Sequence, residues 1–423
     1  MRAGDTAWVL GSAALVLFMT PGLALFYGGM VRAKNVLSVL VQSFVAMGVV
    51  TVVWALLGFS LAFAGGPADR VIGDLRFLGL GSLGHSLPGF AHLPVSPDAV
   101  MVFQMMFAVI TAALLVGGAA DRMRLPGFAL LLVVWLLLVY VPIAHWVFSP
   151  VGWLAHLGVL DFAGGTVVEI NSGFSALALV LVLGKRRGWP REPMRPHSIP
   201  LTVVGAGILW FGWFGFNAGS ALGANDVAVH AFVNTQLAAA TGLLGWVAVE
   251  AVKDQVTTAL GAVSGAVAGM VAITPCAGFV GPMPALLIGL AAGIVCPLAV
   301  QLKYRFLYDD SLDVVAIHGV GGLLGMVLLG IFAEHAVDPA GANGLAFGGL
   351  HLFGVELLAA AVTAGYCFGV TYVLARLVDR VVGLRVTPDQ EAQGLDVTLH
   401  GENAYSPSAP GHLVPSGSPP AEP

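Results

Sequence analysis

Residues 7–30 read AWVLGSAALVLFMTPGLALFYGGM, a run of apolar and small side chains without a single charged residue. An α-helix needs about 20 such residues to cross the hydrocarbon core of a bilayer. The run is also too long for the hydrophobic core of a secretory signal peptide. It therefore predicts a membrane-spanning helix near the start of the chain that is retained in the mature protein.

Apolar runs of this kind recur along almost the whole chain of 423 residues. After a first span at 7–31, windows of about 19 residues place further spans at 38–63, 99–120, 125–148, 162–184, 199–219, 229–251, 256–274, 284–302, 313–333 and 350–376. Only 10% of the residues are charged, against about 25% in soluble domains. The sequence therefore predicts an all-α integral membrane protein whose single transmembrane domain, residues 1–376, has eleven transmembrane helices.

The basic residues predict how these helices are oriented. One side of the membrane receives Arg32, Lys34, Arg122, Arg124, Lys185, Arg186, Arg187, Arg191, Arg195, Lys253, Lys303, Arg305, Arg376, Arg380 and Arg385, and the other receives Arg2, Arg70 and Arg76. Because loops rich in Lys and Arg stay in the cytoplasm, the N-terminus is predicted outside and the C-terminus inside.

The segments outside the spans differ in character. Residues 64–98 contain several prolines and are interpreted as an external loop. Residues 377–405 are mixed polar and predict an ordered cytoplasmic segment, whereas residues 406–423 are rich in Pro, Ser and Gly and predict a disordered tail. The three cysteines show no metal-ligand spacing, so neither a metal site nor another cofactor is expected. No basic run is interleaved with aromatic residues, which argues against nucleic acid as a partner.

Two matching motifs place ionisable side chains inside predicted spans. Asp161 precedes Glu169 by eight residues, and Asp310 precedes His318 by eight. The two spans start from opposite sides in the predicted topology, as inverted repeats of five helices require. Ionisable groups in spanning helices usually face the bundle interior, so Glu169 and His318 are the leading functional candidates, at comparable depth near the midplane. The alternatives are a core histidine satisfied by a neighbour and a glutamate that bonds a helix end.

Asp161 itself suits a helix N-cap, where its carboxylate would satisfy free backbone N–H groups. This structural interpretation is favoured over direct contact with a substrate.

Aromatic side chains gather at the external ends of three predicted spans. They are Phe103 and Phe107 in the third span, Trp146 and Phe148 in the fourth, and Trp210, Phe211, Trp213, Phe214 and Phe216 in the sixth. Ring faces attract small cations by about 0.5 to 2 kcal/mol each. An aromatic belt at the membrane interface is the alternative, and spacing alone favours the belt.

Four long motifs resemble the ammonium transporter family (Amt/Mep/Rh), and specifically its Amt members. They are Phe18–Met30 with Lys34–Leu37, Asp161–Val168, Gly212–Ser220 and Asp309–Gly322. The resemblance runs from about residue 6 to 405. It also includes Gly383–Val386, Glu391–Asp396 and His400–Tyr405, which are similar to the cytoplasmic tail of bacterial members.

The resemblance implies eleven helices in two inverted five-helix repeats plus a last helix, a homotrimer, and a narrow apolar pore through each subunit. The family's paired phenylalanine gate falls on Phe107 and Phe216. Its external cation site includes Phe107 and the hydroxyl of Ser220. Trp213 matches a pore-lining tryptophan, and His318 matches the second of two pore histidines.

Two residues depart from the family pattern. Glu169 stands where most members have the first pore histidine, as in a subset of fungal members. Phe148 stands where the external site normally has tryptophan, and its ring is a poorer partner for a cation than indole. Trp146 cannot substitute for it, because two helix positions rotate a side chain by roughly 200°.

The function implied is that of an ammonium transporter of the cell inner membrane, not an enzyme. Ammonium would be gathered at the external site by Phe107, Phe148 and Ser220 and lose its proton there. Ammonia would then pass the gate and the Glu169–His318 pair, with the proton returned inside. The tail motifs imply a PII-type signal protein as a partner at the cytoplasmic face. Membrane lipid is expected as a second partner.

Two alternatives come from other classes. A signalling receptor with the same fold would bind ammonium without sustained flux, but no kinase or cyclase domain is appended. A membrane hydrolase would need a serine nucleophile to work with His318, and no Gly-x-Ser-x-Gly elbow accompanies that histidine.

Overall fold

The computed structural model describes residues 2–84, 87–90 and 93–405. Helices dominate this part of the chain, and its β-pairing is limited to one isolated bridge, between Met123 and Arg385. The predicted disordered tail at 406–423 lies outside the described residues.

The helices follow one another with short connections. The first half contains α1 (Ala3–Met30), η1 (Ala33–Asn35), α2 (Val36–Val53), η2 (Trp54–Gly58), α3 (Phe59–Phe63), η3 (Leu78–Leu80), α4 (Pro97–Ala119), α5 (Leu125–Trp135), η4 (Leu136–Tyr140), α6 (Val141–Phe148), α7 (Trp153–His156), η5 (Gly165–Ile170), α8 (Asn171–Leu183) and α9 (Ile199–Gly219). The second half contains α10 (Asp226–Lys253), α11 (Ala259–Ile273), α12 (Pro282–Val300), α13 (Leu302–Phe306), η6 (Val315–Val320), α14 (Gly321–Phe332), η7 (Leu345–Phe347), α15 (Leu350–Val381), α16 (Pro388–Gln393) and η8 (Asp396–His400).

Within the described residues, ten helical stretches are long and apolar enough to cross a membrane. The apolar helix α11, with 15 residues, is shorter. Together they account for the eleven predicted spans, and the predicted all-α membrane fold is confirmed. The last helix runs further than predicted, to Val381 in place of 376, because residues 377–382 contain no Gly or Pro that would end it.

The starts of the spans are fixed by local chemistry. Ser96, Ser198, Asn225 and Thr258 each accept a hydrogen bond from the backbone N–H three residues later, at the starts of α4, α9, α10 and α11. Such caps satisfy backbone donors that have no partner within the helix. The helix ends are thereby defined where the chain enters and leaves the apolar layer.

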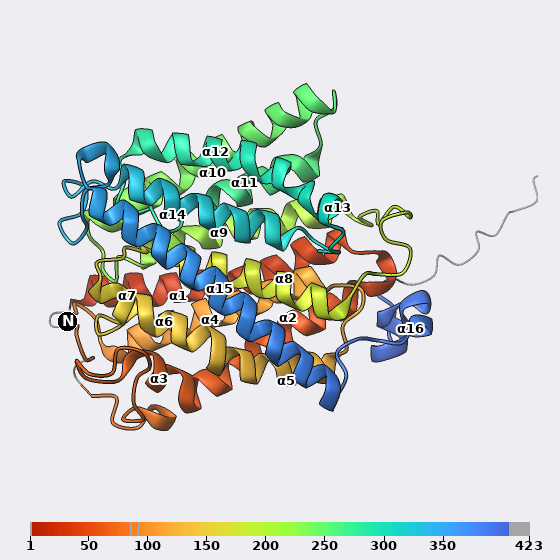
Figure 1. The fold of residues 1–423 in the computed structure, drawn as a ribbon, viewed down its shortest axis with the longest axis horizontal. Helices are drawn as coiled ribbons and strands as arrows, with labels where there is room; N and C mark the ends of the chain where they lie inside the picture. Colours follow the sequence, from red (N-terminus) through yellow and green to blue (C-terminus); the bar gives the residue numbers. More distant parts are fainter. Residues whose placement is uncertain (1, 85–86, 91–92, 406–423) are drawn as a thin grey trace, which may run out of the picture.

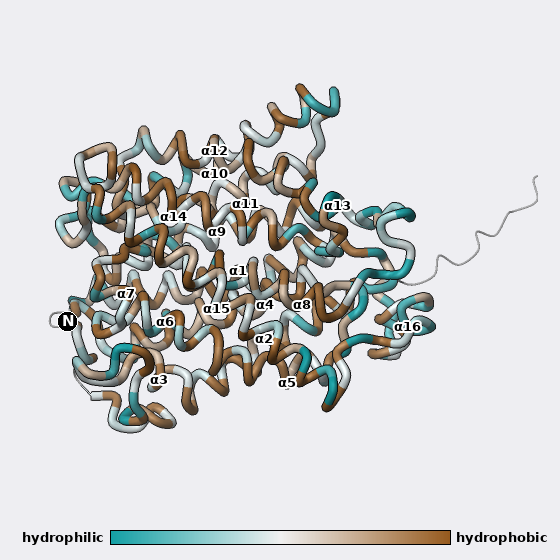
Figure 2. Tube along the Cα trace, in the orientation of Figure 1, coloured by the Kyte–Doolittle hydropathy of each residue, from teal (hydrophilic) through white to brown (hydrophobic). Residues whose placement is uncertain are grey.

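The long helices run side by side along one axis, so that the loops gather at two ends of the molecule (Figure 1). The start of α1 and α7 lie at one end, and α13 and α16 lie at the other. The helices are mostly hydrophobic along their length, and hydrophilic residues gather at the two ends, including the segments around α13 and α16 (Figure 2).

We call the end that carries α16 the basic end. The segments that carry Arg122 and Arg385 lie side by side there, because the backbone N–H of Val386, the residue after Arg385, donates to the carbonyl of Arg122 at 3.0 Å. Arg70 lies at the opposite end, where its carbonyl accepts from the N–H of Trp153 at the start of α7. The positions of Arg122, Arg385 and Arg70 agree with the sides predicted for these three residues from the sequence.

The two halves of the bundle meet at a close contact between backbones. A Cβ added to Gly173 of α8 would lie 2.2 Å from the Cα of Gly319 in η6. Only hydrogen fits in that space, so residue 173 must be glycine for the helices to approach, whereas a Cβ on Gly319 would be in ordinary contact, 3.4 Å from the Cα of Gly173. The close contact between α8 and η6 brings the side chains of η5 and η6 near one another.

Candidate functional site: a buried carboxyl–imidazole pair beneath stacked rings

Three phenylalanine rings from three helices meet near the end opposite the basic end. The rings of Phe107 (α4) and Phe216 (α9) are stacked with their centroids 4.2 Å apart and an interplanar angle of 24°. The ring of Phe148 (α6) stands edge-on to Phe107, with a centroid distance of 6.3 Å. Phe107 and Phe216 are each 1% exposed. Because their rings are in contact, a molecule can pass between them only if a ring rotates.

Ser220, just after α9, is bonded to one member of this aromatic group. Its hydroxyl donates to the carbonyl of Phe216 at 2.9 Å, which leaves its lone pairs free to accept. Trp146 points elsewhere: its indole N–H donates to the carbonyl of Val71, and its ring packs on Tyr366 at 4.7 Å. The rings of Phe107 and Phe148 therefore meet, Ser220 is linked to the same group through Phe216, and Trp146 has other partners.

A narrow cavity of about 20 Å³ lies directly beneath Phe216. Its only ionisable lining residues are Glu169 and His318. The remaining lining residues are apolar or aromatic: Met19, Leu23, Phe26, Ile110, Leu114, Val168, Leu209, Trp213, Phe216 and Val267. A space of this size accommodates about one water-sized molecule.

Trp213 lines the same cavity and lies beside Phe216. Its ring centroid is 5.7 Å from that of Phe216. Its indole N–H donates to the hydroxyl of Thr274 at 3.0 Å, and that hydroxyl donates to the carbonyl of Met270. The indole is thereby held with its polar atom turned to a partner and its apolar face available to the cavity.

Glu169 and His318 are in direct contact. Nδ1 of His318 lies 2.6 Å from Oε2 of Glu169, and the two residues are 5% and 1% exposed. Charge-assisted hydrogen bonds between buried groups are short and strong. The pair can hold a proton between two basic sites, because imidazole and carboxylate both accept and release one.

The two eight-residue motifs have the same local geometry. The carboxylate of Asp161 accepts from the N–H groups of Gly164, Gly165 and Thr166 at 2.6 to 2.8 Å. The carboxylate of Asp310 accepts from the N–H of Val315 at 2.7 Å. Each acid thus bonds the backbone at the first turn of a π-helical segment, η5 or η6. Those two segments carry the buried pair.

The wider turns of η5 and η6 are features that sequence reasoning missed. π-Helical turns often occur at functional sites. Here they begin at Gly165 and Val315 and hold Glu169 and His318 opposite one another. Glycines permit this arrangement, because a Cβ on Gly322 would lie 2.8 Å from the Cβ of Glu169. No periodicity in the sequence distinguishes a π-turn from the α-helix that follows it.

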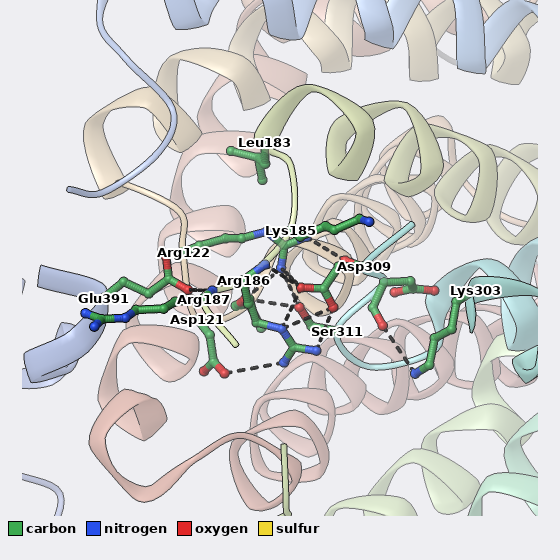
Figure 3. Close-up of polar contacts among 12 residues, drawn as sticks. Asp121, Arg122, Leu183, Lys185, Arg186, Arg187, Lys303, Asp309, Ser311 and Glu391 are labelled. Carbon is green, nitrogen blue, oxygen red and sulfur yellow. Dashed lines mark hydrogen bonds and ion pairs between the residues drawn. The ribbon is translucent and has the colours of Figure 1, made fainter. Parts of the chain in front are cut away.

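A buried network of charges occupies the basic end and was also missed (Figure 3). Arg186 pairs with Asp309 at 2.8 Å and with Asp121 at 3.4 Å. Arg122, fully buried, donates to the carbonyl of Asp309 and to the hydroxyl of Ser311. Burial raises the pKa of Asp309, but the hydrogen bonds and charge of Arg186 outweigh it and hold that pKa below its ordinary value. The network joins three loops at the basic end of the bundle.

The C-terminal segment is docked on this network. Arg385 donates to the carbonyls of Leu183 and Lys185 and to the carboxylate of Glu391. Asp396 accepts from the N–H of Ser38, at the start of α2. Burial raises the pKa of Asp396, against the lowering effect of backbone N–H groups that include Ser38. Residues 383–405 therefore form an ordered part of the basic end.

Comparisons with known proteins agree with this arrangement. Residues 7–405 match the model of the Ammonium Transporter Family. An ammonium transporter of Bacillus subtilis (strain 168) is 48% identical over 409 residues, which are 96% of this chain and 100% of that protein. The crystal structure of Saccharomyces cerevisiae Mep2 superimposes with a TM-score of 0.86 at 36% identity, covering 92% of this chain and 91% of that one.

A further solved structure, described as a sensor Amt protein, gives a TM-score of 0.85 at 29% identity, with 94% of this chain and 98% of that one covered. The match to the family extends from the first span through the docked C-terminal segment. With this extent of similarity in both sequence and fold, the chain belongs to the ammonium transporter family.

Proposed function

We propose that this protein transports ammonium across a membrane. Ammonium is taken up at the external site of Phe107, Phe148 and Ser220, which we call the mouth, and ammonia and a proton then pass separately through each subunit. One observation carries the proposal. An apolar cavity for about one small molecule lies beneath Phe216, and its only ionisable lining groups are the touching Glu169 and His318. An apolar path suits a neutral molecule, and the pair suits a proton.

The energetics favour this separation. Moving a bare ammonium ion through apolar protein would cost tens of kcal/mol by the Born estimate, whereas neutral ammonia is far less costly to bury. Ammonium is therefore expected to lose its proton near Phe107 and Phe216. The proton then moves through Glu169 and His318, and ammonia moves along the apolar wall.

Recruitment of ammonium is assigned to Phe107, Phe148 and Ser220. Aromatic rings attract a cation, and the Ser220 hydroxyl offers lone pairs. Glu169 takes the role that a first pore histidine has in most of the family. Asp161 is assigned a structural role, since its carboxylate is occupied by the first turn of η5.

Transport is tested by currents from the purified protein in proteoliposomes. An ammonium pulse is expected to give a transient current, and potassium at equal concentration is expected to give none. Protein-free liposomes are the control for leak. Equal currents with the two cations, or silence with both in a correctly folded protein, would exclude transport as the main function.

A sensor with little sustained flux is the second candidate. It is motivated by the similarity to the structure described as a sensor Amt protein and by the weaker cation partner Phe148. The greater similarity to the Bacillus transporter favours transport. Tight ammonium binding without current in the pulse experiment would favour the sensor.

Assembly and regulation complete the proposal. The protein is placed in the inner membrane as a homotrimer, with its N-terminus outside and its basic end in the cytoplasm. We assign residues 377–405 a regulatory role, and a PII-type signal protein is the proposed partner at this end. The ordered contacts of Arg385 and Asp396 support a segment that can report on the loops it touches.

Two truncations test whether the C-terminal segment regulates transport or is only docked on the transmembrane domain. Deleting residues 383–405 is expected to change flux or abolish PII binding, because it removes every contact of the docked segment. Deleting only residues 406–423 is the matched control and should leave both unchanged. Unaltered flux and PII binding in the longer deletion would contradict a regulatory segment.

A further inference from the structure

The basic end contains a cavity that the transport path does not use. It has a volume of about 300 Å³ and is lined by Arg32, Lys34, Arg187, Glu192, Glu391 and Ala392. We call it the tail cavity, because the docked C-terminal segment supplies one wall. The other walls come from the loop after α1 and the loop between α8 and α9. Its volume is within the range of small-molecule sites.

The positive charges in the tail cavity are incompletely neutralised within the described residues. Lys34 directs its ammonium group at the carbonyls of Ala392 and Glu391, at 2.6 and 3.3 Å, and pairs with no carboxylate. The guanidinium of Arg187 is exposed and makes no hydrogen bond or ion pair in this part of the chain. Two cations therefore face the same space without counter-ions.

Arg32 adds a third, partly neutralised charge. Its Nε pairs with Asp121 at 3.2 Å, but Asp121 also serves Arg186 and Asn35. The buried Nη2 of Arg32 has no hydrogen-bond partner in the described chain. Unpaired guanidinium nitrogens are costly to bury, so this group adds to the demand for an anion.

The two acids that line the cavity do not cancel these charges. Glu391 is 2% exposed and already occupied, because it accepts from the N–H of Arg187 at 2.6 Å and from Arg385 at 2.9 Å. Glu192 is exposed and is the one carboxylate left to oppose an incoming anion.

We propose that the tail cavity binds a phosphate group, carried either by a free small anion or by a lipid headgroup. A dianion matches two unpaired cations and a third shared one. The planar fork of Arg and the ammonium of Lys are the usual protein ligands of phosphate. The bound group would touch both the loop residues Arg32 and Arg187 and the segment held by Lys34. It would therefore fasten the C-terminal segment to the transmembrane domain, whether or not the protein transports ammonium.

Binding is tested on the full-length protein with inorganic phosphate at low ionic strength, by equilibrium dialysis with a radioactive tracer. Saturable binding is expected. Arg187→Gln should weaken it about tenfold or more, because one charge-assisted hydrogen bond is lost. Glu192→Gln should strengthen it several-fold, because a repelling charge is removed. Arg187 is exposed, so its replacement leaves the fold intact.

Arg191→Gln is the matched control. Arg191 is an exposed basic residue of the same loop and does not line the cavity. It should change phosphate affinity by less than about twofold, since exposed charges at a distance are screened. Equal weakening by the Arg187 and Arg191 variants would mean a diffuse surface charge and would overturn the site.

A second arm identifies the source of the phosphate group. The protein is placed in nanodiscs of phosphatidylcholine with or without phosphatidic acid, and hydrogen exchange of residues 388–396 is measured. Slower exchange with phosphatidic acid, lost in Arg187→Gln, would assign the site to a lipid headgroup even if free phosphate does not bind. The same protection by free phosphate would assign it to a soluble anion. No Arg187-dependent effect of either probe would refute the proposal.

Discussion

Replacing Glu169 by Gln is the most informative perturbation of the proposed path. Gln has nearly the same shape and keeps an oxygen that can accept from Nδ1 of His318, but it cannot take up a proton. The contact it alters is 2.6 Å long and buried, and the rest of the cavity lining is apolar or aromatic. After this replacement His318 is the one ionisable group among the described residues that still lines the cavity.

The size of the effect follows from the contact. A hydrogen bond to a charged group contributes about 1.5 to 3 kcal/mol, and each 1.36 kcal/mol is tenfold in rate. Gln keeps a neutral hydrogen bond, which contributes about 0.5 to 1.5 kcal/mol, so the contact is weakened by roughly 1 to 1.5 kcal/mol and Glu169→Gln is expected to reduce the ammonium-driven current by about 5- to 13-fold or more. Glu169→Leu should reduce it at least as much. Glu169→His should keep a current but change its dependence on pH, because imidazole and carboxyl groups protonate over different ranges.

The assay is the transient current after an ammonium jump, recorded from proteoliposomes with equal amounts of protein at several pH values. Size-exclusion profile and thermal stability in detergent show that each variant is folded. If a well-folded Glu169→Gln protein kept the current and pH profile of the original chain, Glu169 would be structural and the proton path would lie elsewhere.

Further predictions concern the mouth, the helix contact and the buried charges. Phe148→Trp should lower the ammonium concentration for half-maximal current by about 2- to 5-fold, since indole is the better cation partner by roughly 0.5–1 kcal/mol; an unchanged concentration dependence would remove Phe148 from the mouth. Gly173→Ala should lower stability by about 1–3 kcal/mol through overpacking and reduce current, while Gly207→Ala, where a Cβ meets nothing within 4 Å, should do neither; thermal unfolding of both variants distinguishes these outcomes. Asp309→Asn should cost about 3 kcal/mol, because the buried Arg186 loses its nearer carboxylate at 2.8 Å and keeps only Asp121 at 3.4 Å. As the pKa of Asp309 lies below its ordinary 3.8, the unaltered protein should keep this contribution above pH 3.8 and lose it as the pH falls through the lowered pKa; an acid unfolding profile shared by the two proteins would contradict this assignment.

The sequence by itself determined the membrane fold. A bilayer imposes a length of about 20 apolar residues on every span, and that requirement is local, so runs such as residues 7–30 could be recognised without any tertiary contact. The division of basic residues between two ends could also be predicted, because each recognised span moves the next loop to the other side of the membrane. The eight-residue spacing also singled out Glu169 and His318, because an ionisable residue in an apolar run stands out.

Only the tertiary structure decided which of these residues meet. Glu169 and His318 are separated by 149 positions, and Phe107 and Phe216 come from different helices. In a soluble protein the apolar face of a helix predicts its inner side. In a membrane the lipid-facing and protein-facing sides of a helix are both apolar, so the sequence of a span says little about which side faces the protein interior.

The same reasoning explains the features that no motif predicted. The π-turns of η5 and η6, the pairing of Arg186 with Asp309, and the tail cavity depend on loops and helices that approach one another from distant parts of the chain. The charged residues of the loops predict which end of the molecule carries a net positive charge. Their individual partners are set by packing, because a buried charge must find its counter-ion wherever the fold brings one within reach.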